Sequence, residues 1–116
     1  MPATILVVED DPHLRSVISE ALSHEGYRVR QASDGIFALH QVRSEEPDLV
    51  LSDVRLPRLN GAALAERLAN RAEPVPVILM SSNPAPHGCV VPFLPKPFNL
   101  ETLCTLIARV LEKQAS

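Results

Sequence analysis

Short apolar runs alternate along this chain with longer stretches in which apolar residues recur every three or four positions. The runs at residues 4–8, 49–52 and 77–80 are almost unbroken, which is typical of strands buried on both faces of a parallel sheet. Residues 27–31 alternate with polar side chains and indicate an edge strand, and residues 93–94, flanked by prolines, indicate a fifth strand. The pattern therefore predicts five strands.

The stretches between these runs predict four helices, each with an apolar stripe at helical spacing. They are expected at residues 12–24, at about 36–44, from 61 to about 71, and at 100–111. Asp11 and Asn99 stand where caps are needed, and Gly26 ends the first helix. Because strands and helices alternate, we expect an α/β fold with a parallel sheet and helices on both faces.

Length and composition limit the kinds of protein that this chain can be. With 116 residues and 46% hydrophobic content, residues 1–116 are expected to form a single domain. A net charge of −3 and 3% aromatic residues argue against nucleic acid binding. No apolar run approaches a membrane span and no signal peptide is visible, so we expect a cytoplasmic domain. Its two cysteines are expected to be free thiols and its four histidines to be solvated.

Chemically active side chains recur where the predicted strands end: Glu9, Asp10, Asp53, Ser81 and Lys96. In a doubly wound sheet, ligands collect at the carboxyl ends of the strands. Three carboxylates gathered there would repel one another unless a cation intervened, and a set of oxygen ligands fits Mg²⁺, or alternatively Mn²⁺, rather than zinc.

The remaining two strand-end residues, Lys96 and Ser81, suit a bound anion: Lys96 offers a positive charge and Ser81 a hydroxyl donor. Each of the five strand-end residues also has an ordinary interpretation, as a turn former, a helix start or a solvated lysine. Their coincidence at one edge of the sheet favours a phosphate site that contains its own acceptor carboxylate.

Four motifs stand out along the chain: the acidic motif at residues 7–12, the Asp53 loop at residues 51–61, the Lys96-Pro97-Phe98 corner, and the Asp34-Gly35 motif together with Pro47-Asp48. Together they resemble the response-regulator receiver domain of two-component signalling. The resemblance covers essentially the whole chain. It implies a flavodoxin-like doubly wound five-stranded parallel sheet with strand order 2-1-3-4-5.

The resemblance also implies a role for each strand-end residue. Asp53 would accept a phosphoryl group from a phosphohistidine on a sensor histidine kinase or a histidine phosphotransfer protein. Asp10, Asp53 and the backbone carbonyl of Arg55 would bind Mg²⁺, with Glu9 acting through a water. Lys96, before a cis proline, and Ser81 would contact the phosphoryl group. Ser81 and Phe93 would form the conformational switch, and the domain would catalyse only its own phosphorylation and dephosphorylation.

The chain departs from the family between Ser82 and Phe93. Residues 83–92 contain three prolines and a glycine, which cannot sustain several helical turns, so we expect the family's fourth helix to be absent or vestigial. That helix belongs to a face that the family uses for dimerisation and output, so dimerisation and the route of signalling stay open.

Other functions remain as alternatives. A haloacid-dehalogenase-type phosphatase would need a second carboxylate where Arg55 stands, and a flavodoxin-like cofactor binder would need a phosphate loop where Glu9, Asp10 and Asp11 would repel phosphate. The stronger alternative is a receiver-like binding module that recognises a kinase or other partner without productive phosphorylation.

Overall fold

The computed structural model describes residues 2–115 and contains one parallel sheet of five strands in the order β2-β1-β3-β4-β5, as expected. The strands are β1 Thr4–Val8, β2 Arg28–Ala32, β3 Leu49–Asp53, β4 Val77–Ser81 and β5 Phe93–Pro95. Each boundary lies within one residue of the prediction. All residues of β3 and β4 are buried because helices cover both faces of the sheet.

The four helices are α1 Pro12–His24, α2 Gly35–Ser44, α3 Gly61–Ala69 and α4 Leu100–Ala115. The side chain of Asp11 accepts hydrogen bonds from the first turn of α1, and that of Asn99 accepts one from Thr102 in α4, so both predicted caps are confirmed. Gly26 has a φ of 95°, which suits the chain reversal after α1. Among residues 2–115, no helix has both the length and the apolar character needed to cross a membrane.

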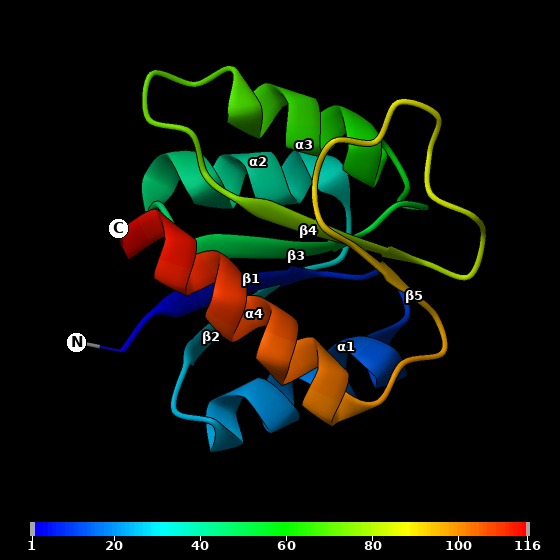
Figure 1. The fold of residues 1–116 in the computed structure, drawn as a ribbon. Helices are drawn as coiled ribbons and strands as arrows, with labels where there is room; N and C mark the ends of the chain where they lie inside the picture. The colour runs from blue at the N-terminus through cyan, green and yellow to red at the C-terminus, as the bar shows by residue number, and fades with distance from the viewer. Residues whose placement is uncertain (1, 116) are drawn as a thin grey trace.

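The sheet separates two hydrophobic layers, with α2 and α3 on one face and α1 and α4 on the other (Figure 1). Successive side chains of each strand point to opposite faces, so that Leu6 and Val8 join the α2–α3 layer while Ile5 and Val7 join the α1–α4 layer. This two-sided burial fixes the register of the strands, and thereby the level at which each strand ends.

The segment between β4 and β5 contains turns and bends and no helical residue over residues 82–92. The fourth helix in chain order, α4, is present, but it follows β5 and is the last helix that the sequence predicts. In Figure 1 the segment runs outward beside α3 before it returns as β5. Cys89 and Val91 pack against the α2–α3 layer, whereas Val90 is 94% exposed.

Candidate functional site

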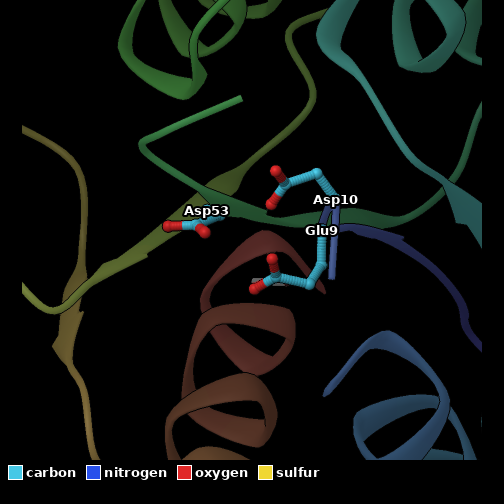
Figure 2. A group of neighbouring side chains, drawn as sticks. All are labelled: Glu9, Asp10 and Asp53. Atoms are coloured by element: carbon cyan, nitrogen blue, oxygen red, sulfur yellow. The ribbon is translucent and has the colours of Figure 1, made fainter. Parts of the chain in front are cut away.

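The sheet register brings the ends of β1 and β3 to the same level. Val8 pairs with Ser52, so Glu9, the next residue along β1, lies beside Asp53 at the end of β3. Figure 2 shows the carboxylates of Glu9, Asp10 and Asp53 gathered at this edge. Their ligand oxygens all lie within 4.8 Å of one another. The three acidic residues that the sequence singles out therefore form one cluster.

Two of these carboxylates are held inside the protein: Glu9 is 1% exposed and Asp53 is 7% exposed, whereas Asp10 faces solvent. Buried carboxylates carry a large desolvation cost unless a cation or hydrogen-bond donors offset it. The oxygen donors of this cluster fit a hard divalent cation such as Mg²⁺. Because Asp10 is exposed, such an ion can reach the cluster from solvent.

Lys96 supplies the positive charge that the structure places at this edge. Its Nζ donates to Glu9 Oε1 at 2.8 Å and to Asp53 Oδ2 at 3.1 Å. Its backbone N–H donates to the carbonyl of Ser81 at 2.8 Å, which joins the ends of β4 and β5, and its peptide bond to Pro97 is cis, as the resemblance implies. The lysine thus bridges carboxylates from two different strands.

Burial and contacts with neighbouring charges shift the pKa values of Glu9 and Lys96. Burial raises the pKa of the Glu9 carboxyl above 4.5, its ordinary value, and the nearby charge of Asp53 raises it further, against the opposing effect of Lys96 and the Asp11 N–H. Burial lowers the pKa of Lys96, but hydrogen bonds and charge interactions with Glu9 and Asp53 outweigh it and raise that pKa above 10.5. Lys96 is therefore firmly charged at neutral pH.

Three further residues were expected at the site: Ser81, Phe93 and Arg55. Ser81 is 2% exposed, and its hydroxyl oxygen accepts a hydrogen bond from the Asn83 N–H at 3.1 Å. Phe93 is half-buried against the α2–α3 layer, and Arg55 lies in the bend after β3 with its side chain exposed. The two free cysteines are half-buried and the four histidines are exposed, as expected.

Two neighbours of the cluster were given no role from the sequence. A methyl group on Gly61 would overlap the carbonyl oxygen of Asp53, so α3 starts in direct contact with the end of β3. The Gly61 N–H also donates to the Val54 carbonyl at 2.8 Å. The second neighbour is Arg15, whose Nη1 donates to the carbonyl oxygen of Glu9 at 2.7 Å. Gly61 belongs to the Asp53 loop on which the resemblance rests, but nothing in the sequence pattern marks Arg15.

Fold and site together define a class: flavodoxin-like domains that carry an acidic cation site and a lysine at the carboxyl ends of their strands. The family model described as the response regulator receiver domain matches residues 5–108, and the chain belongs to this family. Receiver domains bind Mg²⁺ in their active site and act with histidine kinases or phosphotransfer proteins.

Curated relatives support the same assignment. The response regulator MprA of Mycobacterium sp. strain KMS is 33% identical over 120 residues, which cover 97% of this chain and 52% of that protein. MprA of Mycobacterium tuberculosis strain H37Ra is 32% identical with the same coverage. The chain thus spans about half the length of the curated relatives it matches.

Solved structures with the same fold include receiver domains from two kinds of protein. The receiver domain of the sensor histidine kinase PA1611 from Pseudomonas aeruginosa, which has a magnesium ion coordinated in its active site cleft, is 29% identical, with a TM-score of 0.88 and coverage of 97% of this chain and 99% of that one. The chemotaxis response regulator CheY4 of Vibrio cholerae is 28% identical, with a TM-score of 0.85 and coverage of 95% and 99%.

Proposed function

We propose that this chain is a single phosphoacceptor receiver domain, in which Asp53 accepts a phosphoryl group from a phosphohistidine. The observation that carries the proposal is the bridge from Lys96 to both Glu9 and Asp53 beside the exposed Asp10 carboxylate. This arrangement offers a nucleophilic carboxylate, a cation site and a fixed positive charge at one edge of the sheet. Phosphoryl transfer to a carboxylate uses such a nucleophile together with cationic groups that neutralise the charge of the transferred group.

In the proposed reaction, a carboxylate oxygen of Asp53 forms a bond to phosphorus while the phosphorus–nitrogen bond of the donor breaks, and the imidazole leaves with the electron pair. Lys96 Nζ lies 3.1 Å from Asp53 Oδ2, so it can donate a hydrogen bond to the oxygens of a phosphoryl group on Asp53. The Ser81 hydroxyl, on the neighbouring strand, is the proposed hydrogen-bond donor to the same group. The chain would catalyse this modification, and its hydrolysis, on itself alone.

A divalent cation, when bound, supplies charge neutralisation at the transferred oxygens. We propose Asp10, Asp53 and the carbonyl of Arg55 as its ligands, with Glu9 acting through a water. Mg²⁺ is the proposed ion, and Mn²⁺ is the alternative that the same oxygen set would accept. The proposed phosphoryl donor is a sensor histidine kinase or a histidine phosphotransfer protein, and a cytoplasmic location remains a prediction.

Phosphorylation of Asp53 would add about one negative charge and several acceptor oxygens. We propose that Ser81 is drawn toward them and that Phe93 follows, because Ser81 pairs with Pro95 in the same short strand as Phe93. Each new charge-assisted hydrogen bond contributes about 1.5–3 kcal/mol, enough in sum to shift a two-state equilibrium. Residues 82–92, which connect these two positions without a helix, would carry the movement.

The experiment that tests the proposal is intact mass spectrometry after incubation with Mg²⁺ and acetyl phosphate. We expect the wild-type chain to gain one phosphoryl group and Asp53→Asn to gain none. Asp48→Asn is the matched control, because Asp48 lies exposed just before the opposite end of the same strand and should leave the gain intact. NMR spectra with Mg²⁺ and beryllofluoride provide a second measurement.

An absent mass gain, together with NMR spectra that beryllofluoride does not change, would refute the phosphoacceptor function. A chain that then still bound a histidine kinase would be a receiver-like binding module instead. A mass gain that persisted in Asp53→Asn would place the acceptor at another residue.

A further inference from the structure

Arg15 reaches from the first turns of α1 to the end of β1, where the acidic cluster begins. Its Nη1 donates to the carbonyl oxygen of Glu9 at 2.7 Å, and its Nε donates to Gln31 Oε1 at 3.2 Å. The backbone carbonyl of Gln31 in turn accepts a hydrogen bond from Gln41 Nε2 at 2.6 Å. The guanidinium is therefore held between two strands, and its planar fork is suited to two acceptors at a fixed angle.

These contacts hold the main chain of Glu9 on both sides. The Glu9 N–H donates to the carbonyl of Ala32 at 3.1 Å, and the Glu9 carbonyl receives the bond from Arg15. That carbonyl belongs to the peptide unit that connects Glu9 to Asp10. Because a peptide unit is planar, holding this carbonyl also holds the Asp10 N–H and the Asp10 Cα, from which the side chain leaves the backbone.

Asp10 depends on this peptide more than the other two carboxylates of the cluster do. Glu9 and Asp53 each accept a hydrogen bond from Lys96, and Glu9 also accepts one from the Asp11 N–H at 3.1 Å. Within residues 2–115, the Asp10 carboxylate accepts no hydrogen bond and is exposed. Only its own backbone directs it toward the two buried carboxylates.

We propose that Arg15 is a positioning residue of the cation site: by fixing the Glu9–Asp10 peptide, it aims the Asp10 carboxylate at the metal. This inference rests on the proposed Mg²⁺-dependent function. It concerns a residue that touches neither the metal nor the phosphoryl group. A partner that orients a metal ligand typically contributes about 10- to 100-fold to metal affinity.

The test measures the affinity for Mg²⁺ alone by NMR titration of the ¹⁵N-labelled chain, so it does not depend on phosphorylation. We expect Arg15→Met to weaken Mg²⁺ binding by about tenfold. Arg15→Lys, which keeps the charge and one donor, should recover part of the loss. Gln31→Met keeps Arg15 but removes the acceptor of its Nε, and it should weaken binding about threefold.

Arg30→Met is the matched control. Arg30 also donates its Nη1 to a backbone carbonyl, that of Glu45, at 2.6 Å, but Glu45 follows the end of α2 away from the acidic cluster. It should lower the melting temperature and leave Mg²⁺ affinity unchanged. Asp10→Asn, which removes the metal ligand itself, should abolish measurable binding.

The outcomes separate this inference from the proposed function. If the wild-type chain bound no Mg²⁺, the proposed function would fail. If the wild type bound Mg²⁺ and Arg15→Met bound it equally well, or if Arg30→Met weakened binding as much, the role of Arg15 alone would be refuted. Should Arg15→Met not fold, an unchanged affinity in Gln31→Met would refute it.

Discussion

Replacing Lys96 with methionine tests how the acidic cluster is stabilised without a metal. Lys96 is 16% exposed at its side chain, Glu9 is 2% and Asp53 is 10%, so the three groups share a site from which water is largely excluded. Methionine keeps much of the length and removes the charge. Two carboxylates would then remain buried side by side without the cation that both of them contact.

Removing one partner from a buried ion pair costs about 3–5 kcal/mol. Because the edge of the sheet is open to water at Asp10, we expect a value at the lower end, about 3 kcal/mol, at pH 7.5 without Mg²⁺. For a domain of this size that corresponds to a fall of roughly 10 °C in melting temperature. Since burial raises the pKa of Glu9, protonation should relieve part of the repulsion, so the difference from wild type should shrink at pH 5.

The assay is urea unfolding followed by circular dichroism at pH 5 and pH 7.5, with and without Mg²⁺. Lys113→Met is the matched control, because Lys113 is the other lysine of the sequence and lies exposed near the end of α4. It should change the free energy of unfolding by less than about 0.5 kcal/mol. Mg²⁺ should reduce the deficit of Lys96→Met. The reasoning is refuted if Lys96→Met costs no more than Lys113→Met, or if its cost is the same at both pH values.

Three further predictions concern Gly61, Lys96 and Cys104. Gly61→Ala should lower the free energy of unfolding by at least about 2 kcal/mol in urea titrations, because the added methyl group would overlap the carbonyl of Asp53 at the end of β3. The control Ala62→Gly should lower it by about 1 kcal/mol or less, and equal losses would contradict the contact. The stabilisation from Lys96 should be fully present at pH 7.5 and disappear as the pH rises through the raised folded-state pKa of Lys96. The free energies of unfolding of wild type and Lys96→Met should therefore converge in alkaline solution, and parallel curves would exclude this linkage. Burial raises the pKa of the Cys104 thiol, so in a Cys89→Ser background iodoacetamide should modify the folded chain more slowly than the urea-unfolded chain at pH 8, and equal rates would contradict this.

The strands could be predicted closely because their apolar runs end abruptly at polar or turn-forming residues. Helix α3 was harder to delimit: we expected it to run to about Arg71, but it ends at Ala69, and Arg71 pairs with Glu46 at 2.6 Å. That ion pair joins positions 25 residues apart, which no local pattern contains. The sequence pattern therefore could not show this contact beyond the end of α3.

The acidic cluster was predictable because parallel strands bring their carboxyl ends to the same edge. Its internal bonding was not. The sequence predicted Lys96 as a partner for an anion, whereas in the structure it binds Glu9, 87 positions earlier, as well as Asp53. The contact of Arg15 with Glu9 likewise depends on how a long, flexible side chain is oriented, which periodicity cannot reveal. The assignment of catalytic and switch roles to these residues remains a prediction.

The short strand β5 contributes side chains to both hydrophobic layers. Phe93 packs against the α2–α3 layer, and the next residue, Leu94, is buried in the α1–α4 layer. Because neighbouring residues of this three-residue strand pack into opposite layers, any displacement of β5 would disturb the packing on both faces of the sheet at once.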